Sequence, residues 1–234
     1  MRDEMGLGVR LTIASATVAA LMVPFMLLLV VARMPLNELD AGVARRLHAY
    51  AQANPDVTNA LIVWTDAFGP LSWRVAVVLL AIWLVRRGAR RMALWAVTTM
   101  AVGGLLGALM KIIVDRARPD LPDPVALAEG DSFPSGHALN VTLGAGVIVL
   151  TALPLLRPRA RAAAWAIAWF LVVTVACTRV ALGVHYVSDV VAGVMLGVAV
   201  IAATVAGFER WRRAGSPPPP ADRLDADQSS ARRS

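Results

Sequence analysis

The chain has 234 residues, of which 58% are hydrophobic and 17% are charged, and its mean hydropathy is +0.63. An ordinary soluble domain has about 45–50% apolar residues, and its apolar positions alternate with polar ones at helix or strand period. This chain instead has long apolar runs separated by short charged patches. The composition excludes a disordered chain, a disulfide scaffold and a typical cytosolic enzyme, and it favours an all-α, polytopic membrane protein.

The formal net charge is +7, and the arginines cluster in short links between the apolar runs. This distribution indicates membrane topology rather than a nucleic-acid-binding face. The single cysteine, Cys177, excludes an internal disulfide, and its apolar surroundings predict a small buried side chain. The single lysine, Lys111, stands out because arginine supplies every other cation.

Six apolar segments are expected to cross the membrane as helices of about 20 residues. They are residues 11–32, 71–85, 92–114, 138–156, 162–181 and 186–208. The second is short and contains Arg74, so we expect it to begin near Gly69, with Arg74 extending to the interface. Residues 59–64 form either the preamble of this span or a separate interfacial helix. Closely spaced glycines in the third and sixth spans predict tight helix packing: Gly103, Gly104, Gly107, Gly193 and Gly197.

The arginine-rich links at 86–91, 157–161 and 210–213 predict the orientation. By the positive-inside rule they are cytoplasmic, so both termini are inside and the acidic loop after the third span is outside the cell. Residues 1–213 form one membrane domain, and the proline-rich segment 214–234 is expected to be a disordered cytoplasmic tail. The amphipathic segment 35–56 is then outside the cell, either lying on the membrane to shape lipid access or forming a simple surface helix.

Three polar stretches lie at the predicted outward ends of the spans. K-I-I-V-D-R-A-R-P starts at Lys111, P-S-G-H ends at His137, and the third runs from Thr178 to Asp189. Taken singly, they are consistent with interface cations, a helix cap and a surface pair. Their coincidence at one membrane face favours a functional site, because ionisable groups at the ends of bundled helices are usually functional.

These residue types suit phosphoryl transfer. The transferred group spreads negative charge over three oxygens, which Lys111, Arg118 and Arg179 can neutralise. The backbone N–H groups around Ser135 and Gly136 open a helix, and helix N-termini bind anions.

The third stretch supplies a candidate nucleophile. His185 can attack phosphorus through one ring nitrogen, while the other donates to Asp189, four residues later on the same predicted helix face. His137 can then protonate the leaving oxygen and later activate water.

The ordered pattern K-x6-R-P, P-S-G-H and R-x5-H-x3-D resembles the type 2 phosphatidic acid phosphatase superfamily. That superfamily includes undecaprenyl-diphosphate and phosphatidylglycerophosphate phosphatases, glucose-6-phosphatase and vanadium haloperoxidases. The resemblance implies catalysis without a metal or other cofactor. It implies these site residues: Lys111, Arg118, Ser135, Gly136 and Arg179 for phosphate binding, His137 as acid and base, His185 as nucleophile, and Asp189 as its partner. Thr178 replaces the usual serine and keeps the hydroxyl.

The sequence therefore predicts an integral membrane phosphatase whose partners are the bilayer and a lipid phosphate or diphosphate. Undecaprenyl diphosphate is the first expectation, followed by phosphatidylglycerophosphate, phosphatidic acid and an isoprenoid-linked sugar phosphate. Three alternatives stay open. They are a phosphotransferase with another lipid or sugar acceptor, a metal-dependent hydrolase that uses the acidic loop, and a lipid-binding or transport subunit with a vestigial site.

Overall fold

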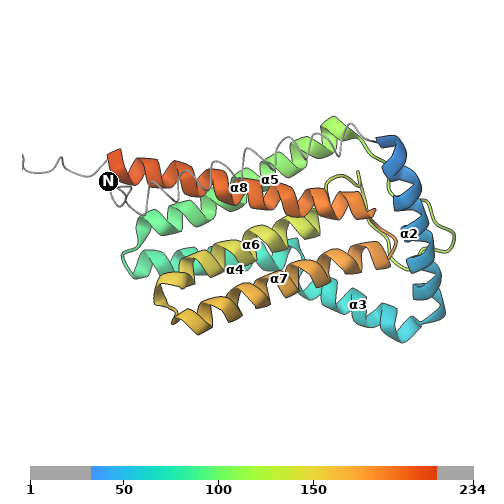
Figure 1. The fold of residues 1–234 in the computed structure, drawn as a ribbon, viewed down its shortest axis with the longest axis horizontal. Helices are drawn as coiled ribbons and strands as arrows, with labels where there is room; N and C mark the ends of the chain where they lie inside the picture. Colours follow the sequence, from blue (N-terminus) through green and yellow to red (C-terminus); the bar gives the residue numbers. More distant parts are fainter. Residues whose placement is uncertain (1–32, 215–234) are drawn as a thin grey trace, which may run out of the picture.

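The computed structural model describes residues 33–214. The predicted span at 11–32 and the predicted tail beyond Ala214 lie outside the described residues. The described part is helical, without strands, and Figure 1 shows the arrangement of its helices. The elements are α2 (Arg33–Ala53), α3 (Pro55–Ala67), α4 (Pro70–Arg86), α5 (Arg90–Val114), α6 (Gly136–Ala152), the short 3-10 helix η1 (Leu153–Leu155), α7 (Pro158–Ala181) and α8 (Val187–Ala214).

Proline sets where several of these helices begin. Pro55, Pro70 and Pro158 each occupy the first turn of a helix, where the missing N–H costs no hydrogen bond. The second predicted span is longer than expected, because α3 and α4 together form an apolar stretch of 32 residues that is interrupted at Gly69. Among the described residues, five stretches are long and apolar enough to cross a membrane: Pro55–Arg86, Arg90–Val114, Gly136–Leu155, Pro158–Ala181 and Val187–Trp211.

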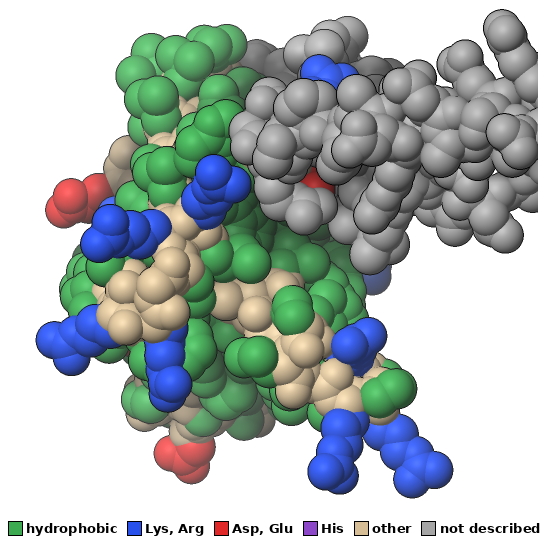
Figure 2. Space-filling model, turned by 90° about the vertical axis from the view of Figure 1, so that its left-hand side faces the viewer, with side chains coloured by type: hydrophobic (Ala, Val, Ile, Leu, Met, Phe, Trp, Pro, Cys, Tyr) green, Lys and Arg blue, Asp and Glu red, His purple; other side chains and the backbone are tan. Residues whose placement is uncertain are grey.

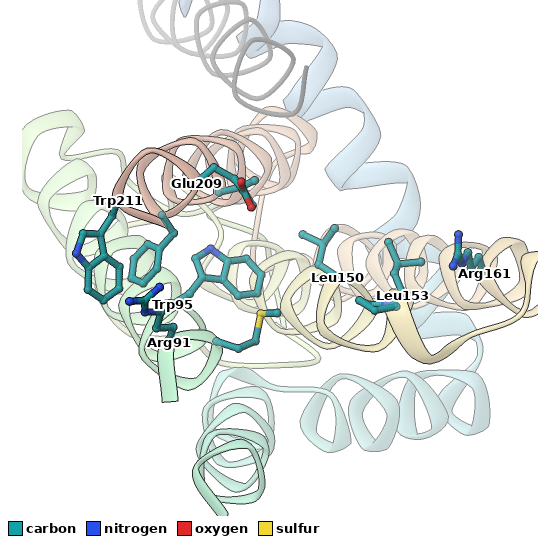
Figure 3. Close-up of a pocket in the computed structure, with 11 residues that line it drawn as sticks. Arg91, Trp95, Leu150, Leu153, Arg161, Glu209 and Trp211 are labelled. Carbon is teal, nitrogen blue, oxygen red and sulfur yellow. The ribbon is translucent and has the colours of Figure 1, made fainter. Parts of the chain in front are cut away.

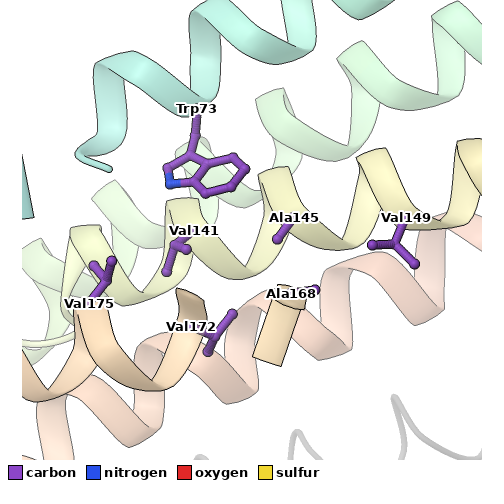
Figure 4. Packing of buried hydrophobic residues seen from close by; sticks show 7 residues of the cluster. All are labelled: Trp73, Val141, Ala145, Val149, Ala168, Val172 and Val175. Atoms are coloured by element: carbon purple, nitrogen blue, oxygen red, sulfur yellow. The ribbon is translucent and has the colours of Figure 1, made fainter. Parts of the chain in front are cut away.

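Helix α6 forms the centre of the bundle and packs against α4, α5, α7 and α8. Most of its span is buried (67%), whereas only 22% of the spans of α5 and α7 is buried. Figure 4 shows part of the core around α6. Its labelled residues are Trp73, Val141, Ala145, Val149, Ala168, Val172 and Val175.

The outer faces of the helices are apolar, as a lipid environment requires. Leu79, Ile112 and Phe170 are each more than half exposed, and they lie on three different helices. Apolar side chains on a helix that spans a bilayer meet lipid tails without penalty. The chain is therefore a multi-pass membrane protein. The prediction that Cys177 is buried is wrong: its side chain is exposed on α7, because that position faces away from the bundle.

The two ends of the bundle differ sharply in charge. One end, on the left in Figure 1, carries the arginines at the C-terminus of α4 and at the N-termini of α5 and α7. Figure 2 looks onto this end and shows basic side chains around an apolar centre. A cavity of about 600 Å³ lies here, and Figure 3 shows Arg91 beside Trp211 on one side and Arg161 on the other. The three motif stretches lie at the opposite end, so this cavity is remote from them.

Helix α2 crosses the motif end of the bundle, on the right in Figure 1. Two apolar side chains of the segment predicted to be amphipathic, Leu39 and Tyr50, are 68% and 56% exposed. The buried face consists instead of Asp40, Ala44, His48 and Ala51. The segment is therefore no simple surface helix, because it presents two polar side chains to the rest of the protein.

Candidate active site

A short connection between α7 and α8 positions His185. Helix α7 ends at Ala181, Gly183 adopts a φ of +70° that favours glycine, and the N–H groups of Val184 and His185 both donate to the carbonyl of Arg179 at 3.2 Å. This turn leaves His185 two residues before α8, with only 2% of its surface exposed. The imidazole is thus held by a turn and excluded from water.

Asp189 lies in the first turn of α8 and is completely buried. Its Oδ2 accepts a hydrogen bond from the N–H of Tyr186 at 2.9 Å and lies 3.5 Å from Nδ1 of His185. This is an ion-pair distance, and Nδ1 has no hydrogen-bond partner among the described residues. Catalytic hydrogen bonds are often long without substrate and tighten in its presence. The two residues are neighbours as predicted, but the predicted reason is wrong. They do not share a helix face, because α8 begins only at Val187.

The guanidinium of Arg118 lies against the other side of the imidazole. Its Nη1 is 3.2 Å from Nε2 of His185 and 2.8 Å from the carbonyl oxygen of Val184. Further hydrogen bonds to the carbonyls of Glu129, Gly130 and Asp131 hold the guanidinium in place. Because arginine can only donate, Nε2 must carry the lone pair and the neutral ring carries its proton on Nδ1, facing Asp189.

The surroundings of His185 keep its ring neutral at physiological pH. Burial lowers the pKa of His185, Asp189 partly opposes this, and Arg118 and Arg179 add to the lowering, so that the pKa is about 4. At pH 7 the ring therefore has an unprotonated Nε2, which is the form that can act as a nucleophile.

The other two predicted cations lie in the last turns of α5 and α7. Lys111 donates from Nζ to the carbonyl of Asp131, the same carbonyl that Arg118 contacts. Arg179 is 7% exposed and donates from Nη1 to Thr65 Oγ1 at 3.4 Å, while its Nε has no partner among the described residues. A buried donor without a partner is costly unless a ligand satisfies it.

The P-S-G-H stretch begins α6 beside the third stretch. The N–H of Ser135 donates to the carbonyl of Asp189 at 3.0 Å, and its buried Oγ has no partner in the described part of the chain. His137 is half-buried and lies within electrostatic range of Arg179, His185 and Arg118. All eight predicted site residues therefore lie at one end of the bundle: Lys111, Arg118, Ser135, Gly136, His137, Arg179, His185 and Asp189.

Several residues of this region were not singled out from the sequence. Asp40, Arg116 and Ser188 form hydrogen bonds around Asp189, and Thr65 contacts Arg179. Arg116 lies inside the first stretch, so its place in the sequence could have indicated it. Asp40 lies 149 positions before Asp189, and nothing in the local sequence connects the two residues. The acidic loop does not build a metal site: across residues 33–214, no three His, Cys, Asp or Glu side chains converge on a possible metal position.

An apolar groove runs along α4 and α5 on the outside of the bundle. Two adjoining hollows, of about 330 and 680 Å³, share Val78 and Val97 in their walls. Arg74, near the start of α4, lines the end of this groove that is nearer the motif stretches. Its Nε donates to Asn140 Oδ1 at 3.3 Å, and the Asn140 amide in turn donates to the carbonyl of Gly136 at 2.8 Å. The groove is thus linked to the P-S-G-H stretch.

Comparison with known proteins agrees with this arrangement. A family model described as the PAP2 superfamily matches residues 92–213, which include all three motif stretches. The chain belongs to the PAP2 superfamily. As a PAP2 protein it is a phosphate-monoester or diphosphate hydrolase of the membrane. This membership confirms the resemblance that the motif stretches indicated.

Individual PAP2 proteins resemble this chain over most of their length. An undecaprenyl-diphosphatase from Sulfolobus acidocaldarius is 28% identical over 183 residues, 76% of this chain and 84% of the relative. A decaprenylphosphoryl-5-phosphoribose phosphatase from Mycobacterium tuberculosis is 34% identical over 149 residues, 61% and 77% of the two chains. The crystal structure of a transmembrane PAP2-type phosphatidylglycerolphosphate phosphatase from Bacillus subtilis superposes with a TM-score of 0.74 at 25% identity, covering 82% of this chain and 96% of that one.

Proposed function

We propose that this PAP2 protein removes phosphate from a membrane lipid phosphate or diphosphate through a phosphohistidine formed on His185. One observation carries the proposal. A buried, neutral imidazole faces the carboxylate of Asp189 with Nδ1 and the guanidinium of Arg118 with Nε2. This arrangement prepares Nε2 for attack and places a cation where a phosphate oxygen would sit beside it.

In the first step, a phosphate oxygen takes over the hydrogen bond from Arg118, which frees the Nε2 lone pair. Nε2 forms a bond to phosphorus while the bond from phosphorus to the leaving oxygen breaks. His137 donates a proton to that oxygen, so the lipid leaves as an alcohol or a monophosphate. Asp189 stabilises the positive charge that develops on the ring, and Arg118, Arg179 and Lys111 neutralise the phosphoryl oxygens.

In the second step, His137 accepts a proton from a water molecule. The water oxygen then bonds to phosphorus, and the bond between phosphorus and Nε2 breaks. Inorganic phosphate leaves, and His185 returns to its neutral form. The unpartnered buried donors at Ser135 and Arg179 support this role, because a phosphate oxygen would satisfy them.

We propose a polyprenyl diphosphate, undecaprenyl diphosphate first, as the substrate. The two adjoining hollows between α4 and α5 are lined mainly by apolar side chains, which suits a hydrocarbon chain. Two of the relatives described above have names that refer to polyprenyl lipids, which supports the same class. Phosphatidylglycerophosphate and phosphatidic acid, each with two acyl chains, are the competing substrates.

The test is release of phosphate from each of these lipids by purified protein in detergent. We expect the highest kcat/KM for undecaprenyl diphosphate, and a loss of about 10³-fold or more in kcat for His185→Ala. His48→Gln is the matched control, because it replaces the one histidine outside the motif stretches and keeps a donor toward the carbonyl of Pro122. It should retain activity within a few-fold.

Three outcomes would contradict the proposal. His185→Ala could retain activity, no lipid phosphate could be turned over, or a phosphorylated lipid or sugar acceptor could form faster than free phosphate. The last outcome would identify a phosphotransferase instead. A parallel assay with EDTA tests the metal-dependent alternative, since the proposed chemistry predicts full activity in the chelator.

A further inference from the structure

Helix α2 places a buried carboxylate beside the candidate active site. Asp40 is 3% exposed and lies on the inward face of α2, a helix that is far from all three motif stretches in the sequence. Its Oδ1 accepts the N–H of Ser188 at 3.1 Å, and its Oδ2 accepts both the Ser188 hydroxyl and Arg116 Nη2, the latter at 2.9 Å. A carboxylate this deep in the protein is stable only with such charged and hydrogen-bonded partners.

Arg116 connects Asp40 with the carboxylate that faces His185. Its Nη1 donates to Asp189 Oδ1 at 2.7 Å and to the Ser188 hydroxyl at 2.6 Å. Its guanidinium also lies 4.2 Å from the centre of the Tyr186 ring. The guanidinium therefore bridges two buried carboxylates, one on α2 and one on α8.

This bridge determines how Asp189 presents its second oxygen. Because Oδ1 is held by Arg116, rotation of the carboxylate is restricted, and Oδ2 faces Tyr186 N–H and His185 Nδ1. Without Asp40, Arg116 would lose the carboxylate that its Nη2 contacts, and Asp189 would be held less tightly. The partners that orient an active-site side chain affect its reaction although they never touch the substrate.

We propose that Asp40 and Arg116 are positioning residues that hold the Asp189 carboxylate toward His185, so that helix α2 takes part in phosphoryl transfer. The inference deepens the proposed function and rests on it. Asp40 lies outside the three motif stretches, and Arg116 lies inside the first one without being among the predicted site residues. Both act through Asp189 rather than on the phosphate.

The test is Asp40→Asn in the full-length protein in detergent. The variant keeps the size of the side chain and an acceptor for the Ser188 N–H, but it turns an N–H₂ group toward the donors of Arg116 and Ser188. We expect kcat to fall about 10-fold while KM stays within about twofold, because the bridge supports the nucleophile and not the anion-binding donors.

Two inhibitors separate positioning from a general structural effect. Orthovanadate adopts the five-coordinate geometry of phosphorus in transfer and bonds to the nucleophile, so its inhibition constant should rise about 10-fold in Asp40→Asn. Inorganic phosphate needs only the anion-binding donors, so its inhibition constant should stay within about twofold. Equal weakening of both inhibitors would show a structural role and overturn the proposal.

One control variant and one alternative variant accompany Asp40→Asn. Glu38→Gln neutralises an exposed carboxylate on the same helix and should match the wild type. If Asp40→Asn does not fold, Ser188→Ala removes the hydroxyl between Asp40 and Arg116 and should lower kcat about threefold with the same inhibitor pattern. Wild-type values in the folded variant would overturn the positioning role. Retained activity in His185→Ala would instead overturn the underlying proposed function, so the two failures are distinguishable.

Discussion

At the scale of single residues, the two ring nitrogens of His185 have different roles. Arg118 can only donate, so its contact with Nε2 requires the proton on Nδ1, where Asp189 can accept it. Burial among cations keeps the ring unprotonated, which an exposed histidine with a pKa near 6.5 would achieve only in part at pH 7. The pair therefore combines an unprotonated Nε2 with a stabilised imidazolium in the transition state.

This environment predicts an unusual acid limb in the pH profile. The pKa of His185 is lowered to about 4, so the ring loses its lone pair to a proton only as the pH falls toward 4. We expect kcat/KM, which reports the free enzyme, to keep its His185-dependent activity through pH 6 and to fall with a midpoint nearer 4 than 6.5. The measurement is a kcat/KM profile corrected for the ionisation of the lipid phosphate. A corrected midpoint near 6.5 would contradict the geometry described for the ring.

At the scale of elements, close contact between α6 and α8 joins the second and third motif stretches. A Cβ atom added at Gly193 on α8 would lie 2.6 Å from the carbonyl oxygen of Ser135 and 3.2 Å from the backbone nitrogen of Leu139. Only glycine lets the two helices approach this closely. The predicted tight packing is confirmed at this position, whereas at Gly104 on α5 no atom lies within 4 Å of an added Cβ.

These two glycines give a matched pair of substitutions. Gly193→Ala forces α8 away from the start of α6, so we expect a destabilisation of about 1–3 kcal/mol and a loss of activity, because Ser135 and Asp189 separate. Gly104→Ala adds a methyl group without a clash and should match or exceed wild-type stability. Because Gly104 lines the groove between α4 and α5, this variant is the control for stability and not for activity. Thermal unfolding in detergent tests both variants, and phosphate release tests Gly193→Ala. If Gly193→Ala changed neither stability nor activity, the contact between the helices would be looser than the Cβ distances at Gly193 indicate.

At the scale of the whole molecule, the bundle separates two kinds of charge along its length. Arginines without catalytic assignments surround one end, and the candidate site with α2 across it occupies the other. The positive-inside rule then supports a cytoplasmic arginine end and a site on the outer surface. A lipid whose tail lies in the groove between α4 and α5 would present its head group at the candidate site from within the membrane.

The orientation predicts which positions react from outside the cell. In a Cys177→Ala background, Asp120→Cys in the acidic loop should be labelled by a membrane-impermeant maleimide in intact cells. Arg87→Cys between α4 and α5 should be labelled only after the membrane is permeabilised. Both native side chains are exposed, so accessibility within the protein does not differ. The reverse labelling pattern would place the candidate site on the cytoplasmic side.

The sequence by itself determined the class of protein, most helices and the motif residues, because hydrophobic run length and residue chemistry are local properties. It could not show that His185 and Asp189 meet across a turn, that α3 extends the second span, or that Cys177 faces outward. Those features depend on which helix faces meet, and that is decided by packing among segments distant in the chain. For the same reason the sequence did not predict the role of Asp40. Its buried position and its contact with Arg116 exist only because α2 crosses the end of the bundle.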